Sequence, residues 1–205
     1  MRNKLLFVEG IDDFHFICNF LECLGIKNIE VIKTEGKSKL KLAISSYLKS
    51  NSTVKFESIS VILDADTSFD GTEESIRDIL GKCGLFNNIK HANPPLGDGP
   101  KTSCFIMPGK DKSGAIEDLI LEYCNKQNLF TYIEHYFSEL DRNDTEIKSH
   151  DINYSYPKND KKAKLQVYLS SQYDSDTRIG TSIKKNILDI SHGDFDEIRN
   201  YLLSI

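Results

Sequence analysis

Residues 5–16 read LLFVEGIDDFHF, and this stretch decides the fold. Its first four residues form a continuous apolar run, which is typical of a strand buried on both faces of a sheet. Glu9 and Gly10 end the run. Beyond them, apolar side chains recur three or four positions apart as far as Leu24, as on one face of a helix that stops at Gly25. The stretch therefore predicts a strand, a tight turn and a helix.

The same unit recurs along the first part of the chain. Apolar runs at residues 29–32, 59–63 and 104–107 predict three more strands, and helical periodicity follows each of them. Thr72 is the expected N-cap of the helix after the third strand, because Glu73 and Glu74 would then occupy its first turn. Alternating strands and helices predict an α/β fold with a Rossmann-like parallel sheet and helices on both faces.

The second part of the chain has a different pattern. A segment rich in Pro and Gly at residues 84–103 predicts a loop, and helical patterns recur at residues 129–140, 161–171 and 194–203 around a polar stretch at 141–160. We expect residues 1–125 to form an α/β core. Residues 126–205 are expected to form a mostly helical C-terminal extension packed on that core.

Composition limits the classes of partner. The 205 residues include 26 Lys and Arg against 31 Asp and Glu, so the net charge is −5 and nothing global attracts the chain to nucleic acid. A phosphate-bearing partner would need local basic patches or bound cations. The five cysteines include no Cys-x-x-Cys pair, which favours a reducing, cytoplasmic setting, and no stretch is long enough to span a bilayer.

Carboxylates follow the predicted strands. Glu9 closes the first strand, Asp64 and Asp66 close the third, and two further acids stand in the first turns of helices, Asp13 and Glu117. Ligands of open parallel sheets bind beyond the carboxyl ends of the strands, so these acids should gather at one edge. Crowded carboxylates need protons or cations to balance them, and oxygen ligands favour Mg²⁺ or Mn²⁺. Asp12 equally fits a helix cap and is not included in the site.

A family resemblance follows from these motifs. Leu6-Phe7-Val8-Glu9-Gly10, followed by Val61-Ile62-Leu63-Asp64-Ala65-Asp66, resembles the toprim domain of topoisomerases, bacterial primases and the overcoming-lysogenization-defect (OLD) nucleases. The OLD-type version adds an Asp four residues after the Glu, matched by Asp13. It also adds a Ser-Gly-x-x-Glu element, matched by the run from Ser113 to Glu117, and a downstream Lys. The layout is also similar to that of small stand-alone toprim-like proteins.

The resemblance implies a nuclease that cuts DNA or RNA with two Mg²⁺ or Mn²⁺ ions. It implies metal ligation by Glu9, Asp13, Asp64, Asp66 and Glu117. Ser113 would position a ligand or a metal-bound water, although this residue also fits an ordinary N-cap. Lys162, preferred over Lys164, would neutralise charge on the phosphate. Glu9, Asp64, Asp66 and Lys162 are thus the predicted catalytic residues.

Two lysine-rich windows are the predicted nucleic-acid contacts. One spans residues 33–41 and the other residues 158–164, and both also fit solvated helix faces. The lysines assigned to nucleic acid are Lys37, Lys39, Lys41, Lys161 and Lys164. OLD nucleases carry an ATPase ahead of the toprim domain, and this sequence shows no such region. We therefore expect a separate ATPase subunit as partner, as in phage-defence systems.

Other interpretations of the same residues stay open. Asp64 and Asp66 also resemble the nucleophile loop of haloacid-dehalogenase-type phosphatases, but those enzymes usually place the loop after the first strand, and Glu9 would have no role. A receiver-like signalling domain would use Asp12, Asp13 and Asp64, but would lack the element that contains Ser113. A non-catalytic toprim-like binding subunit would be expected to lose at least one acid.

Overall fold

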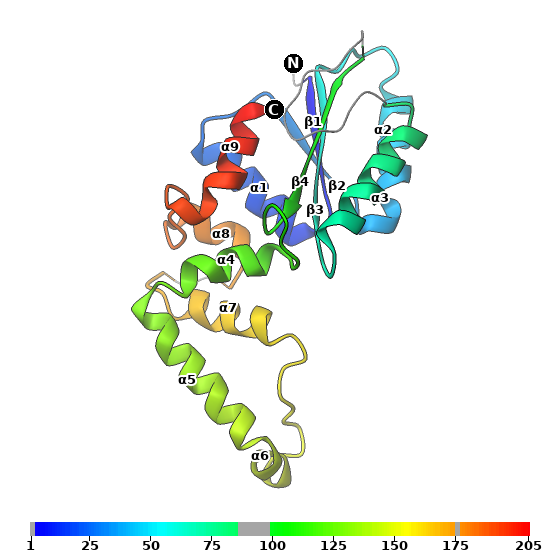
Figure 1. The fold of residues 1–205 in the computed structure, drawn as a ribbon. Helices are drawn as coiled ribbons and strands as arrows, with labels where there is room; N and C mark the ends of the chain where they lie inside the picture. Colours follow the sequence, from blue (N-terminus) through cyan, green and yellow to red (C-terminus); the bar gives the residue numbers. More distant parts are fainter. Residues whose placement is uncertain (1–2, 86–98, 175–176) are drawn as a thin grey trace.

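The computed structural model describes residues 3–85, 99–174 and 177–205, and within these ranges the strands form one parallel sheet (Figure 1). The strand order is β2-β1-β3-β4. The strands are β1 (Lys4–Val8), β2 (Ile29–Lys33), β3 (Ser58–Asp64) and β4 (Lys101–Met107). The predicted α/β class with a Rossmann-like parallel sheet is confirmed.

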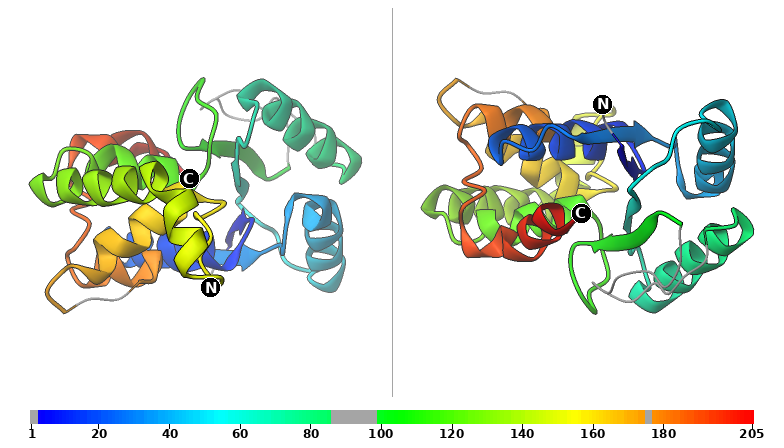
Figure 2. Two further views of the ribbon diagram at one scale, coloured as in Figure 1. Left: turned by 90° about the horizontal axis from the view of Figure 1, so that it is seen from below. Right: turned by 90° about the horizontal axis from the view of Figure 1, so that it is seen from above.

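The central strands β1 and β3 bury both of their faces, as their apolar runs require, whereas only Ile29 of the edge strand β2 is buried. Leu6, Val8 and Ile62 belong to one apolar cluster, whereas Leu5 and Phe7 belong to the other. Helices α2 (Leu40–Ser50) and α3 (Phe69–Lys82) cover the second face. Helix α1 (Ile11–Cys23) lies on the first, together with C-terminal helices (Figure 2). Helices therefore cover both faces of the sheet.

The C-terminal residues form further helices. These are α4 (Ile116–Cys124), α5 (Asn128–Arg142), α6 (Asp144–His150), α7 (Asp160–Ser170), α8 (Ile179–Lys184) and α9 (Asp196–Ser204). Helix α8 packs on α1, and α7 packs on both α4 and α5. Phe195, Ile198 and Leu202 lie in the same apolar cluster as the strand residues Leu6 and Phe105. Helices α5 and α6 project away from the sheet (Figure 1).

Some predicted boundaries are wrong. Helix α3 begins at Phe69 rather than Thr72, because Ser68 is the N-cap and its Oγ accepts a hydrogen bond from the Gly71 amide at 3.1 Å. The Thr72 hydroxyl instead donates to the main-chain oxygen of Ala65 at 3.3 Å. Strand β4 begins at Lys101, three residues early, inside the predicted loop 84–103; residues 86–98 of that loop lie outside the described ranges.

Short helices in polar surroundings escaped prediction. The polar stretch 141–160 contains α6, and α8 was not predicted at all. In contrast, Gly25 has the positive φ of 72° expected of a residue that ends a helix. No helix among the described residues has the length and apolar character needed to cross a membrane.

Candidate functional site

The carboxyl ends of the strands bring the predicted acids to one edge. In the parallel register, Val8 of β1 pairs with Ile62 of β3, and Asp64 pairs with Met107 of β4. Glu9 follows Val8 directly, so its main chain leaves the sheet beside the end of β3. We call the group Glu9, Asp13, Asp64, Asp66 and Glu117 the acidic rim.

Two loops of the acidic rim are joined to each other. Asp66 and Gly114 exchange main-chain hydrogen bonds of 2.8 and 2.7 Å, which attach the loop after β3 to the segment before α4. The Ile116 amide then donates to Oδ1 of Asp64 at 3.2 Å. Ser113, adjacent to Gly114, therefore lies beside Asp66, and Glu117 stands in the first turn of α4.

Two glycines stand just before the helices α1 and α4, where a larger residue would contact an aspartate side chain. Gly114 has a φ of 124°, and a Cβ built there would lie 2.4 Å from Oδ2 of Asp118. Gly10 has an ordinary extended backbone, but a Cβ there would lie 2.9 Å from Oδ2 of Asp13. The Gly10 amide donates to that oxygen at 2.8 Å. Asp13 in the first turn of α1 and Asp118 in the first turn of α4 therefore each turn a side chain back toward the main chain that precedes the helix.

Burial raises the pKa of three acids of the rim. Burial is the largest cause for Asp64, whose pKa rises to about 8, and the negative charges of the other four acids raise it further. Burial also raises the pKa of Asp13, which is 7 % exposed, against the lowering effect of its main-chain hydrogen bonds. The pKa of Glu9 is raised by burial and partly lowered by Lys37. The charges of Glu9, Asp13, Asp66 and Glu117 all raise the pKa of Asp64, so Asp64 lies within electrostatic reach of the other four acids.

One oxygen of the acidic rim lacks a partner. Oε2 of Glu9 is buried, and it has no hydrogen bond within the described part of the chain. Burying a carboxylate oxygen without a hydrogen-bond donor destabilises the folded state, because the oxygen loses its hydrogen bonds to water and gains none from the protein. Glu9 is therefore an acid of the rim whose burial is not offset by a hydrogen bond to this oxygen.

Two lysines contact the rim. Nζ of Lys37 lies 2.5 Å from Oδ2 of Asp66. Nζ of Lys162 lies 3.0 Å from Oδ2 of Asp12 and 3.8 Å from Oε1 of Glu117. The hydrogen bond to Asp12 is the main cause that raises the pKa of Lys162. The predicted downstream lysine thus lies at the rim, and its partner Asp12 is an acid that the predicted site did not include.

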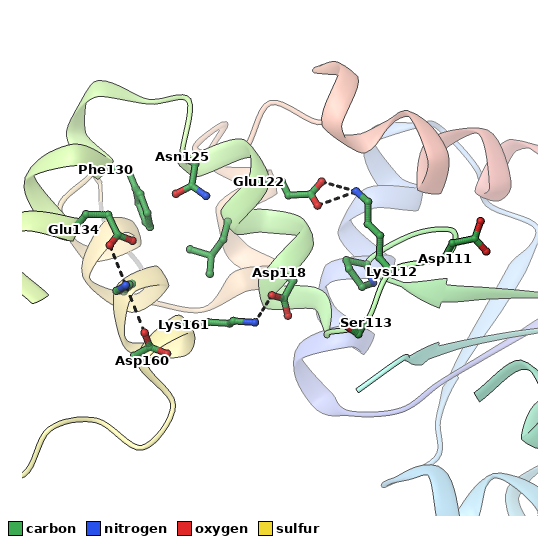
Figure 3. A pocket seen from close by; sticks show the side chains of 13 residues that line it. Asp111, Lys112, Ser113, Asp118, Glu122, Asn125, Phe130, Glu134, Asp160 and Lys161 are labelled. Carbon is green, nitrogen blue, oxygen red and sulfur yellow. Dashed lines mark hydrogen bonds and ion pairs between the residues drawn. The ribbon is translucent and has the colours of Figure 1, made fainter. Parts of the chain in front are cut away.

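The ion pairs described for the other lysines assigned to nucleic acid are with acids outside the rim. Lys39 pairs with Glu35 at 3.3 Å, and Lys41 is exposed. Lys161 and Lys164 line a groove of about 620 Å³ beside Ser113 (Figure 3). Lys161 pairs with Asp118 and Lys164 with Glu134, at 2.6 and 3.0 Å. Acids outnumber lysines along this groove, so its own charge does not favour phosphate.

The side chains do not enclose a cation in their present positions. Within the described ranges, no three His, Cys, Asp or Glu side chains are arranged so that they could hold a metal ion. Asp66 and Glu117 instead turn to Lys37 and Lys162. The rim is therefore an acid cluster in which Asp66 and Glu117 pair with lysines, whereas Glu9, Asp13 and Asp64 are acids whose pKa is raised by burial.

The fold and the rim define an α/β protein with a cluster of acids at the carboxyl ends of its strands. The chain belongs to the family described as protein of unknown function DUF3226, which it matches over residues 3–205. No curated protein and no solved structure matches it. The family description names no activity, so the resemblance to toprim and OLD nucleases stays a prediction.

Proposed function

We propose that this protein is a metal-dependent nuclease of the OLD-like toprim class, which hydrolyses phosphodiester bonds of DNA or RNA with Mg²⁺ or Mn²⁺. The observation that carries the proposal is the pair Glu9 and Asp64. One has a buried oxygen without a partner, and the other has a pKa of about 8 at the ligand-binding edge of a parallel sheet. Strongly perturbed acids at such an edge are typical of functional sites.

The donor set fits a divalent cation. Carboxylate oxygens are the ligands that Mg²⁺ and Mn²⁺ prefer, and a cation beside Glu9 and Asp64 would offset the burial of both carboxylates. The residues that would hold metal are Glu9, Asp13, Asp64, Asp66 and Glu117. Because Asp66 and Glu117 contact lysines in this structure, their side chains must rotate toward the metal. When bound, divalent cations would polarise the phosphate and activate a water molecule.

The chain's own residues supply the rest of the chemistry. In hydrolysis, a water oxygen bonds to phosphorus, a phosphorus–oxygen ester bond breaks, and the leaving oxygen receives a proton. Negative charge grows on the phosphate oxygens in the transition state. Lys162 is the candidate donor to them, since its ammonium already lies at the rim beside Glu117. Ser113, placed beside Asp66 by the Gly114 bridge, would orient a ligand or a water.

The proposed setting follows the same resemblance. We place the protein in the cytoplasm, with DNA or RNA as substrate and a separate ATPase subunit as the partner that licenses cutting in phage defence. Recovery of the protein from its native host together with a nucleotide hydrolase is the expected result of a pull-down. Recovery of this chain alone would contradict the ATPase.

A cleavage panel tests the proposed function. Single- and double-stranded DNA and RNA are incubated with the protein and Mg²⁺, Mn²⁺ or EDTA, and a phosphomonoester is included to detect a phosphatase. We expect metal-dependent cutting of at least one nucleic acid and a metal-induced rise in melting temperature, because metal binds the folded state alone. Asp64→Ala should abolish both effects and stay folded.

The matched control is Asp78→Ala, which removes an exposed acid of α3 that pairs only with Lys82 among the contacts described. It should cut as the wild type does. A wild-type protein whose melting temperature ignores both metals would contradict the proposal. Hydrolysis of the phosphomonoester alone would favour the phosphatase, and metal binding without any cleavage would favour a non-catalytic binding subunit.

A further inference from the structure

Lys37 is fixed beside Glu9 by the main chain. The Thr34 amide donates to the oxygen of Val8 at 2.9 Å, and the Gly36 amide donates to the oxygen of Glu9 at 3.2 Å. These bonds attach the loop after β2 to the end of β1. Thr34 is buried, so the loop cannot move away without exposing it. Lys37 therefore begins at a defined point next to the first acid of the rim.

The loop also directs Lys37 across the sheet edge. Glu35 and Gly36 have positive φ values of 61° and 109°, which reverse the chain before the short helix η1 (Lys37–Lys39). The Lys37 ammonium bonds to Asp66 and lowers the pKa of Glu9, so it lies between acids that follow β1 and β3. Lys39, two residues later, turns back to Glu35. Only the first lysine of η1 contacts the rim.

Lys37 and Lys162 approach the rim from opposite faces of the sheet. The helix η1 leads into α2, whose side chains Leu40 and Ile44 pack in one apolar cluster. Helix α7 packs beside α4, and its residues Leu165 and Leu169 belong to the other cluster. A phosphate lying over the rim would therefore be within reach of a cation from either side.

A divalent cation could replace Lys37 as the partner of the Asp66 carboxylate. Asp66 is 63 % exposed in its side chain, and solvent weakens ion pairs at such positions. A divalent cation competes for the same carboxylate with twice the charge. Once Asp66 ligates metal, the Lys37 ammonium has three hydrogen-bond donors and a new anion beside it, the substrate phosphate.

We propose that Lys37 is a further catalytic residue, which binds Asp66 in the metal-free protein and contacts a non-bridging phosphate oxygen of the substrate once metal has taken Asp66. The inference rests on the proposed nuclease function and deepens it. It assigns Lys37 to the reacting phosphate. Lys39 and Lys41 would contact only other phosphates along the backbone of the nucleic acid. It also makes substrate binding stronger with metal, because metal displaces Lys37 from Asp66.

The test compares Lys37→Met, Lys37→Arg and the control Lys82→Met, whose lysine pairs with Asp78 on α3. Mn²⁺ affinity is measured by calorimetry, and binding of a fluorescein-labelled oligonucleotide by anisotropy with Ca²⁺ or EDTA. Cleavage is measured with Mn²⁺. Lys37→Met should bind Mn²⁺ about fivefold more tightly, since it removes a positive charge beside the metal. It should lose about 100-fold in kcat, the cost of removing one donor to a transition-state oxygen.

The remaining outcomes separate the alternatives. Lys37→Arg should recover part of kcat, and wild-type protein should bind the oligonucleotide more tightly with Ca²⁺ than with EDTA. A Lys37→Met protein that loses Mn²⁺ affinity and melting temperature together would reveal a structural ion pair and overturn the inference. Unchanged oligonucleotide binding and kcat would overturn it as well. If wild-type protein binds no Mn²⁺, the proposed function itself fails, whatever Lys37 does.

Discussion

The charged form of the Asp64 carboxyl is unfavourable in the folded protein. It is the last residue of a strand whose preceding side chains are buried, and burial together with four neighbouring acids raises its pKa to about 8. The unfolded chain exposes the same carboxyl to water, where its pKa is about 3.9. Between about pH 4 and pH 8, Asp64 therefore keeps a proton in the folded protein that it releases in the unfolded chain.

This difference predicts a pH-dependent gain in stability from Asp64→Asn. The native pKa exceeds the unfolded pKa, so the contribution of Asp64 to the free energy of unfolding is greatest below about pH 4 and declines up to about pH 8. Asn keeps the oxygen that accepts from Ile116 but carries no charge. In EDTA, Asp64→Asn should melt above wild type at pH 8, and the gap should close toward pH 5.

Thermal melts across this pH range check the prediction, with Asp78→Asn as the control for loss of an exposed acid. A lower melting temperature for Asp64→Asn at pH 8 would contradict it. The same variant should gain nothing from Mn²⁺. One substitution would then stabilise the fold and remove the proposed metal binding.

Individual residues of the rim were predictable to different degrees. The acids that follow a strand or begin a helix could be located from sequence, because parallel strands end at a common edge. Glu9, Asp64 and Glu117 are examples. The partners of Lys37 and Lys162 could not, since Lys162 reaches Asp12 across 150 positions of sequence. No local pattern encodes such a contact, which depends on how α7 packs against α4.

At the scale of elements, the bridge between the β3–α3 loop and the segment before α4 determines the shape of the rim. The apolar strands around it could be predicted as continuous runs, and the positive φ at Gly25 agrees with the predicted helix stop. Helix α8 could not be predicted, because a six-residue helix shows too little periodicity. The bridge between Asp66 and Gly114 could not be predicted from the sequence either, because main-chain hydrogen bonds between loops do not require particular side chains.

Gly114→Ala tests the bridge. A Cβ there would lie 2.4 Å from Oδ2 of Asp118, which accepts from the Ala115 amide at 2.9 Å and also belongs to the carboxylate that pairs with Lys161. The positive φ adds strain of about 1–3 kcal/mol. We expect a lower melting temperature and weaker Mn²⁺ binding, because the loop that carries Asp66 shifts.

Gly99→Ala is the matched control. Gly99 is also in an irregular segment, and a Cβ added to it would meet no atom of the described residues within 4 Å. It should leave melting temperature and Mn²⁺ affinity unchanged. If Gly114→Ala behaves like Gly99→Ala in both measurements, the bridge does not position the rim.

At the scale of the whole molecule, the C-terminal half is packed into the same apolar cluster as the sheet. Helix α8 contacts α1 so closely that a Cβ at Gly180 would lie 2.4 Å from Cβ of His15. Asn19 of α1 also donates to the main-chain oxygen of Gly180 at 2.7 Å. We expect the parts 1–125 and 126–205 to unfold as one cooperative unit.

Urea unfolding of wild type and Gly180→Ala checks this expectation. The added methyl has to push α8 from α1, at a cost of about 1–3 kcal/mol, so the midpoint should fall while the transition stays single. Gly193→Ala is the control, because its nearest contact is Asp196 at 3.9 Å. Two separate transitions, or a Gly180→Ala midpoint equal to that of wild type, would show that the helical part is independent.

The contact between Lys162 and Asp12 also has a consequence for synthesis. The ribosome releases β1 and the first acids early, whereas α7 follows only after more than two thirds of the chain has been translated. During that interval Asp12 and Glu117 have no lysine from α7 beside them. A product cut short before α7 would contain all five acids of the rim but lack Lys162. An incomplete chain would therefore lack one of the two cations proposed to engage a phosphate.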